Sequence, residues 1–340
     1  MQLRRLHRMP QTFLIGIMKT KTATFFDLVR TDLLEVEARM RISPSQHHPS
    51  LDKVIDYLLS SGGKRIRPIL VLLTSGMLGA DRDESINLAA SIEMLHTATL
   101  VHDDLIDGSK LRRGIPTLNA KWGPGATVLT GDYIFARAAH LASTIGSKEL
   151  MEIYARTLMT IVNGEISQLF NTLVVDPQLE YYDRIYAKTA SLFEVSTEGA
   201  AILSGSKGEV IKAMKSFGYH IGIAFQIVDD VLDFISEQEQ VGKPVANDLR
   251  RGLITLPVLY YSEANPDGDK LIEELQQREM DDQGIERLIN AIRASDAIKQ
   301  TLEQADRFVS AGEEMLDGMP ATPQKEALHE LAHYVVKRTI

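Results

Sequence analysis

The chain has 340 residues, 44% of them hydrophobic and 24% charged, which describes a globular protein with a large core rather than a disordered tail. Thirty-seven basic against 46 acidic residues give a net charge of −9, which argues against a general nucleic-acid-binding surface and makes any phosphate site local. The lack of cysteine excludes disulfides, thiolate nucleophiles and sulfur-ligated metals, so that a metal ion would be held by oxygen.

The first 26 residues carry five Lys or Arg and no acid, around a short apolar stretch from Phe13 to Met18. This stretch is too short for a secretory signal. We predict a flexible basic segment over residues 1–24, with Met18 as an alternative initiator and organellar targeting as the competing interpretation. Residues 25–340 are predicted to form one domain, and no apolar run approaches the roughly 20 residues of a membrane span.

Helical periodicity dominates this domain, because apolar residues recur at three- and four-residue spacing and strand-like alternation is nearly absent. Glycine- and proline-rich breakers such as Gly62-Gly63 and Gly123-Pro124 separate the runs. The sequence therefore predicts an all-α bundle with short loops. The predicted helices span residues 25–40, 51–60, 66–79, 84–107, 126–145, 148–170, 180–204, 208–235, 254–264, 269–278, 282–293, 295–317 and 323–338.

Two acidic clusters with the same spacing end two otherwise apolar helices. The first Asp cluster is Asp103, Asp104 and Asp107, and the second Asp cluster is Asp229, Asp230 and Asp233. At about 3.6 residues per turn, the first and last Asp of each cluster stack on one face, and the middle one lies about 100° to the side. One such cluster is best explained as a solvated helix end, but two with identical spacing indicate a shared function.

If the two helix ends face one another, like charges about 4 Å apart repel by about 4 kcal/mol at an effective dielectric of 20, and only cations make the pocket stable. Carboxylate sites without His or Cys select hard ions. Mg²⁺ that keeps waters and bridges to phosphate oxygens fits better than a closed Ca²⁺ cage. The residues therefore predict a metal–diphosphate site.

The cations that a diphosphate needs lie close to the breakers and to both clusters. Gly62-Gly63 lets the backbone approach a ligand, and the basic residues after it suggest an anion cradle. His96 lies seven residues before Asp103, and on spacing alone a hydrogen-bonded core histidine explains it equally well. The basic candidates are Lys64, Arg67, Arg112, Arg113, Lys188 and Lys243.

These motifs, taken in order, resemble the trans-isoprenyl diphosphate synthases, and most of all the bacterial medium- and long-chain heptaprenyl type. The resemblance runs from about residue 51 to the C-terminus and implies a single large helical bundle of the isoprenoid synthase type with a central active-site cavity. It rests on Gly62-Gly63-Lys64-Arg65-Ile66-Arg67-Pro68, His96 to Asp107, Leu111-Arg112-Arg113-Gly114, Gly131-Asp132, Gly164-Glu165 with Gln168, Lys188-Thr189-Ala190-Ser191-Leu192-Phe193, Phe225-Gln226 before the second Asp cluster, and Gly242-Lys243-Pro244 followed by Asp248-Leu249.

The resemblance implies a role for each matching residue. Asp103, Asp104, Asp107, Asp229, Asp230 and Asp233 would hold three Mg²⁺ on the allylic diphosphate. Arg112, Lys188, Gln226 and Lys243 would contact the same substrate, and Thr189 with Gln226 would steady the carbocation. Lys64, Arg67, His96 and Arg113 would bind isopentenyl diphosphate. Leu253 departs from the pattern, because many relatives have Lys there in a Gly-Lys-x-Thr stretch, and this puts that phosphate contact in doubt.

The residues before the first Asp cluster bear on product length. Ala98 and Thr99 are both small, whereas bulky aromatics at these positions cap the tunnel in short-chain members of the family. The resemblance therefore predicts an all-trans product from hexaprenyl to octaprenyl, with heptaprenyl favoured, made from isopentenyl diphosphate and a farnesyl or geranylgeranyl primer. Gly218 and Gly222 either thin the tunnel wall or allow close helix packing.

Other functions compete with this one. A shorter-chain farnesyl or geranylgeranyl synthase needs the same motifs. A class I terpene cyclase shares the first Asp cluster but needs no second diphosphate site, and a regulatory subunit would have eroded clusters. We expect a cytoplasmic homodimer with transient membrane contact for product release and no nucleic-acid partner, while a catalytic subunit that requires a small subunit stays open.

Overall fold

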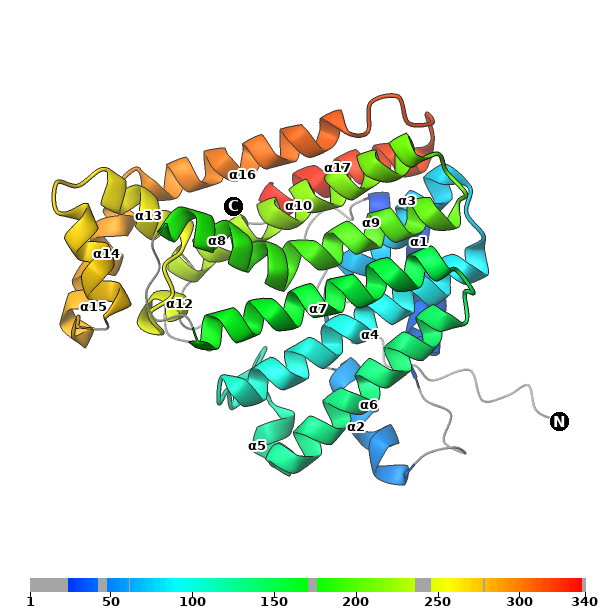
Figure 1. Cartoon of the computed structure of the whole chain (residues 1–340), viewed down its shortest axis with the longest axis horizontal. Coiled ribbons are helices and arrows are strands. Elements are labelled where there is room, and N and C mark those ends of the chain that lie inside the picture. Colours follow the sequence, from blue (N-terminus) through cyan, green and yellow to red (C-terminus); the bar gives the residue numbers. More distant parts are fainter. Residues whose placement is uncertain are drawn as a thin grey trace.

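The computed structural model of the chain describes residues 24–41, 48–60, 62–170, 176–235, 246–277 and 279–337. Helices account for most of these residues, which confirms the predicted all-α class (Figure 1). The basic segment predicted over 1–24 lies outside the described residues except for its last residue, and Lys243 lies outside them as well. No helix in the described ranges is both long enough and apolar enough to cross a bilayer.

The bounds of the helices agree closely with the apolar periodicity, and α10 begins and ends where it was predicted. The helices are α1 (Thr24–Met40), α2 (Pro49–Ser60), α3 (Ile66–Leu78), α4 (Arg82–Ile106), α5 (Leu118–Trp122), α6 (Pro124–Ser143), α7 (Lys148–Phe170), α8 (Pro177–Ile185), the π-helix η2 (Tyr186–Ala190), α9 (Ser191–Leu203), α10 (Gly208–Ile235), α12 (Asn247–Arg250), α13 (Leu256–Glu263), α14 (Gly268–Gln276), α15 (Asp282–Ala294), α16 (Ala297–Glu314) and α17 (Pro323–Lys337).

The long helices α4, α6, α7, α9, α10 and α16 run side by side along much of the molecule (Figure 1). Helix α3 is apolar on nearly every side and is buried against α4 and α9, as expected of a helix without a polar face. Helices α14, α15 and α16 are amphipathic and lie at the outside of the bundle. This packing places the ends of α4 and α10, which carry the Asp clusters, inside the bundle.

Local sequence signals explain where α4 begins and ends. The Asp81 carboxylate accepts hydrogen bonds from the backbone N–H of Asp83 at 2.9 Å and of Glu84 at 3.0 Å, so it caps the first turn. At the other end Asp107 is the C-cap, and Gly108 follows with φ +62°, a conformation that glycine adopts without strain. The first Asp cluster is therefore held at a defined helix end.

Three features were not predicted. The predicted helix over 180–204 is divided by the π-helix η2, and residues 118–122 and 247–250 form short helices. Strand β1 (Leu111–Arg112) pairs antiparallel with β2 (Ile115–Pro116). These elements are too short to produce a periodic pattern, and a π-helix differs from an α-helix by one inserted residue that side-chain spacing barely records.

Candidate active site

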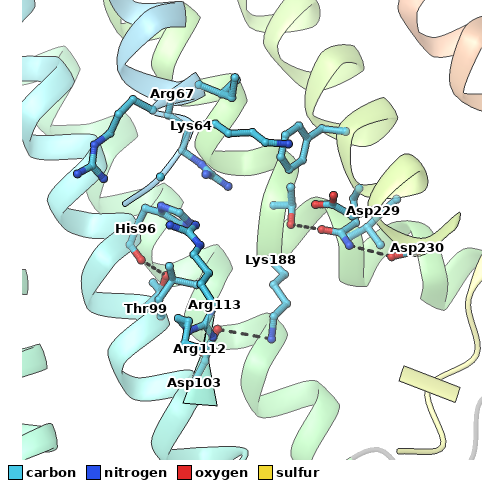
Figure 2. A pocket seen from close by; sticks show the side chains of 18 of the residues that line it. Lys64, Arg67, His96, Thr99, Asp103, Arg112, Arg113, Lys188, Asp229 and Asp230 are labelled. Carbon is cyan, nitrogen blue, oxygen red and sulfur yellow. Dashed lines mark hydrogen bonds and ion pairs between the residues drawn. The ribbon is translucent and has the colours of Figure 1, made fainter. Parts of the chain in front are cut away.

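A cavity of about 1190 Å³ lies between α3, α4, η2 and α10. Asp103 and Asp107 line it from the end of α4, and Asp229 and Asp230 line it from α10. Figure 2 shows Asp103 on one side and Asp229 and Asp230 on the other, with Lys188 between them. The two helix ends thus share one cavity, as their matching spacing predicted.

The other two aspartates, Asp104 and Asp233, are not among the described residues that line this cavity, so four of the six aspartates predicted to hold Mg²⁺ line it. Asp104 turns toward β1, where Arg112 Nε donates to both of its carboxylate oxygens at 2.9 Å. Asp233 lies further along α10, and its Oδ2 accepts the backbone N–H of Asp248 at 3.0 Å. Asp104 lies about 100° around α4 from Asp103, so its side chain faces β1. Asp233 lies one turn beyond Asp229 on α10, so its side chain reaches the backbone of Asp248.

Each carboxylate of the first Asp cluster contacts its own cation. Lys188 Nζ lies 3.7 Å from Asp103 Oδ2 and 2.7 Å from Glu165 Oε1, while Arg112 pairs with Asp104. Arg251 holds both oxygens of Asp107. Burial raises the pKa of Asp103 to about 6, although the Lys188 charge opposes this rise.

Asp230 belongs to a buried chain of hydrogen bonds. The Tyr181 hydroxyl donates to its Oδ2 and Gln226 Nε2 to its Oδ1, both at 2.8 Å. The Thr189 hydroxyl donates to Gln226 Oε1 at 2.7 Å, which brings the two predicted carbocation-facing residues together. Burial, with the negative charge of Asp248, raises the pKa of Asp230 to about 7.

One side of the cavity, here called the basic side, is formed by residues from the start of α3, from α4 and from the β1–β2 turn. Arg67 is 8% exposed, and its guanidinium lies 4.9 Å from the centre of the Phe193 ring. Burial lowers the Arg67 pKa to about 10. Burial together with the charges of Arg67 and Arg113 lowers the His96 pKa well below its ordinary value, so His96 is neutral. Lys64 and Arg113 line this side as well, so the predicted isopentenyl-side residues come together.

Arg65 and Glu93, which were not among the predicted site residues, form a pair of positioning residues under this basic side. Arg65 has φ 51°, and its Nη1 donates to Glu93 Oε1 at 2.9 Å while its Nε donates to Glu37 Oε1 at 3.3 Å. The Glu93 carboxylate also lies 3.9 Å from His96 Nδ1. The only sequence signal was an acid within an apolar stretch of α4. Glu165 and Arg251 were likewise not among the predicted site residues.

Of the two residues predicted to control product length, one lines the cavity and the other is buried behind its wall. Thr99 lines the cavity, and its hydroxyl donates to the His96 carbonyl at 2.8 Å. Ala98 is fully buried and is not among the lining residues of the described part. It lies one turn before His102, whose ring contacts Val128 and Phe135 of α6. The 100° step between neighbouring helix residues explains the difference.

The donor atoms of the cavity suit a hard divalent ion that is shared with a ligand. Among the described residues, no three His, Asp or Glu side chains are close enough to hold a metal ion by themselves. The lining carboxylates offer oxygen atoms only, the donors that Mg²⁺ and Ca²⁺ prefer, and the buried Nε of Arg67 has no hydrogen-bond partner among the described residues. Carboxylates that share an ion with phosphate oxygens, beside a guanidinium whose Nε has no hydrogen-bond partner among the described residues, fit this arrangement.

The protein is all-α, and its central cavity combines two aspartate-bearing helix ends with a buried basic side. The chain belongs to the polyprenyl synthetase family, whose model matches residues 48–292. It is 35% identical to heptaprenyl diphosphate synthase component 2 of Geobacillus stearothermophilus over 94% of this chain and 99% of that protein.

Solved structures agree with this assignment. A decaprenyl diphosphate synthase from Rhodobacter capsulatus matches with a TM-score of 0.85 and 33% identity over 93% of this chain and 99% of that one. A polyprenyl synthase from Caulobacter crescentus, complexed with calcium and isoprenyl diphosphate, matches with a TM-score of 0.82 and 34% identity over 93% and 97%. The protein has the isoprenoid synthase fold and is a trans-prenyl diphosphate synthase, which is a prenyltransferase. Geranylgeranyl synthases are also structural neighbours.

Proposed function

We propose that the enzyme adds isopentenyl diphosphate repeatedly to a farnesyl or geranylgeranyl diphosphate primer, giving an all-trans product from hexaprenyl to octaprenyl, with heptaprenyl favoured. The observation that carries this proposal is the pairing, in one cavity, of two Asp clusters with a separate basic side. Two diphosphates can then bind at once, which a terpene cyclase does not need. The heptaprenyl relative supports the length, and the decaprenyl and geranylgeranyl neighbours define the alternatives.

In this proposal Asp103, Asp107, Asp229 and Asp230 hold Mg²⁺ with the allylic diphosphate, and Asp104 and Asp233 support the two clusters. Three ions are expected. Arg112, Lys188 and Gln226 contact the same diphosphate; Lys243, which lies outside the described residues, is proposed from sequence alone. Lys64, Arg67, Arg113 and neutral His96 bind the diphosphate of isopentenyl diphosphate, because they gather on the basic side.

The reaction begins when the allylic C–O bond breaks and its electron pair leaves with the diphosphate. Bound Mg²⁺ supplies Lewis acidity that lowers the cost of this charge. Lys188 and Arg112 already lie beside the carboxylates and add positive charge without reorganisation. The double bond of isopentenyl diphosphate then forms the new C–C bond to the carbocation, and a proton passes to the departed diphosphate. Thr189 and Gln226 line the cavity, and the hydrogen bond between their side chains holds their polar groups beside this step.

We propose that Thr99 and Ala98 both set product length, Thr99 as part of the cavity wall and Ala98 from the layer behind it. Replacement of Thr99 by Phe fills space at the wall and should shorten the product. Ala98→Phe tests the deeper position, since it should shorten the product only if the growing chain passes between α4 and α6. Product lengths of both variants are compared with the natural protein by chromatography after dephosphorylation.

We further propose a homodimer, formed through α6 and α7. These neighbouring helices expose an apolar surface, here called the α6–α7 surface, with Leu129 of α6 and Met159, Ile166 and Phe170 of α7 at 71%, 66%, 47% and 76% exposure. Such a stripe on a helix is typical of a protein–protein contact. A cytoplasmic location, with transient membrane contact for release of the apolar product, stays a prediction.

The Geobacillus relative is named a component, which supports the alternative that this catalytic chain requires a small subunit. Incubation of the purified chain alone with isopentenyl diphosphate, farnesyl diphosphate and Mg²⁺ decides this. We expect products longer than geranylgeranyl from the single chain. An inactive chain that becomes active with a second subunit would favour the heteromer, and geranylgeranyl as the sole product would contradict the proposed length.

A further inference from the structure

The ion pair between Arg251 and Asp107 joins two segments that lie 144 residues apart in the chain. Asp107 ends α4, and Arg251 directly follows α12. Arg251 Nη1 donates to Asp107 Oδ2 at 3.0 Å and Nη2 donates to Oδ1, so the guanidinium holds the carboxylate with both arms. Both side chains line the cavity and remain partly exposed.

This contact occupies the carboxylate oxygens that a divalent ion would use. Oxygen ligands lie about 2.0–2.6 Å from Mg²⁺ or Ca²⁺, so an ion at Asp107 excludes a guanidinium from the same side. The Arg251 guanidinium, once displaced from Asp107, stays close to the other ligands of the ion. Its planar fork matches phosphate oxygens as well as it matches a carboxylate.

Arg251 is the positively charged side chain of this segment that can reach a ligand in the cavity, as its neighbours show. Arg250 also carries charge, but it pairs with Glu286 of α15 and is not among the lining residues of the described part. Leu253 does line the cavity but brings no charge. The segment 246–256 therefore offers the cavity one arginine, placed two residues before the position where the Gly-Lys-x-Thr pattern has its lysine.

We propose that Arg251 exchanges partners during substrate binding: it neutralises Asp107 in the metal-free protein and turns to the allylic diphosphate once divalent ions are bound at Asp107. This inference rests on the proposed function. It makes Arg251 a substrate-binding residue that replaces the charge missing at Leu253. It also makes Arg251 a competitor of the metal ion when no diphosphate is present.

These two roles predict opposite effects of Arg251→Ala in calorimetric titrations. Mn²⁺ alone should bind several-fold more tightly, because its competitor at Asp107 is gone. Inorganic diphosphate titrated in the presence of Mn²⁺ should bind about tenfold more weakly, because its new partner is gone. Arg250→Ala is the matched control and should change neither affinity. Arg251→Lys keeps the charge without the fork and should give intermediate values.

A second variant moves the charge. Arg251→Ala combined with Leu253→Lys should regain most of the diphosphate affinity that Arg251→Ala loses, and its KM for farnesyl diphosphate should return toward that of the natural protein. Its affinity for Mn²⁺ alone should stay as high as in Arg251→Ala. Unchanged diphosphate affinity in Arg251→Ala, or a double variant no better than the single one, would overturn the proposal. The titrations need no turnover, so a protein that binds as predicted but forms no isopentenyl-dependent product would instead contradict the proposed function.

Discussion

Asp230 shows how burial shapes the chemistry of a single side chain in this cavity. The residue is 3% exposed, and the pKa of its carboxyl is raised to about 7 from an ordinary value near 4. The folded metal-free protein therefore keeps a proton that the unfolded chain loses above about pH 4. This group lowers stability progressively as the pH rises from about 4 to 7, and the full penalty is present above pH 7.

We predict that Asp230→Asn stabilises the metal-free protein at pH 8 by a few kcal/mol, on the order of the free energy of this pKa shift, and changes stability little at pH 4. The variant should at the same time lose prenyl transfer. Thermal unfolding at both pH values measures the effect, and the exposed Asp317→Asn is the control. A variant that is less stable at pH 8 than the natural protein would show that the Asp230 carboxylate is well stabilised without metal.

Glu93 acts on the basic side through other residues. It is 4% exposed and fixes Arg65, whose left-handed backbone conformation shapes the loop that carries Lys64. Glu93→Gln should raise the KM for isopentenyl diphosphate about tenfold while kcat with saturating substrate changes much less, because the positioning of the loop is lost but the allylic side is intact. Glu37→Gln removes the second, more exposed partner of Arg65 and should have a smaller effect. A fall in kcat at unchanged KM would contradict this role.

At the scale of elements, the close approach of α10 to η2 and α9 positions the second Asp cluster. A Cβ atom on Gly222 would lie 2.6 Å from Ala190 Cα, and one on Gly218 would lie 2.5 Å from the Phe193 carbonyl oxygen. Of the two roles that the sequence allowed for these glycines, the structure supports close packing. Gln226 and Asp230 follow one and two turns later on the same helix.

Gly222→Ala should therefore destabilise the protein by about 1–3 kcal/mol, since the backbone of η2 must move to admit a methyl group. The shift should also weaken the Thr189–Gln226 contact and lower kcat. Gly208→Ala, at the start of the same helix, has open space around its Cβ position and is the matched control. Equal melting temperatures for Gly222→Ala and Gly208→Ala would contradict the tight packing.

The sequence predicted most elements because apolar periodicity records which side of a helix is buried. The bounds of α10 followed from spacing alone, whereas the shared cavity of the two helix ends was expected from their matching spacing together with the family resemblance. Spacing along one helix does not say which segments of the chain pack beside it. The contact of Asp104 with Arg112 was therefore not predictable. The Glu93–Arg65 and Arg251–Asp107 pairs join distant segments, and no local pattern announces them.

At the scale of the whole molecule, the α6–α7 surface predicts the oligomeric state. Met159→Glu with Ile166→Glu places charges in the middle of this surface, where a dimer would have to desolvate them. We expect light scattering after gel filtration to show a dimer for the natural protein and a monomer for this variant. Leu34→Glu, at a 56% exposed leucine of α1, should stay dimeric. A dimeric Met159→Glu/Ile166→Glu variant would place the interface elsewhere.

In the proposed function, two facing Asp clusters hold divalent ions on an allylic diphosphate beside a second diphosphate site. The most direct measurement is product analysis of the purified protein with labelled isopentenyl diphosphate and farnesyl diphosphate, with Mg²⁺ and with excess chelator. We expect labelled all-trans products longer than geranylgeranyl that disappear with the chelator and in Asp103→Asn and Asp229→Asn. Label incorporation that persists without divalent ions, or in both variants, would contradict it.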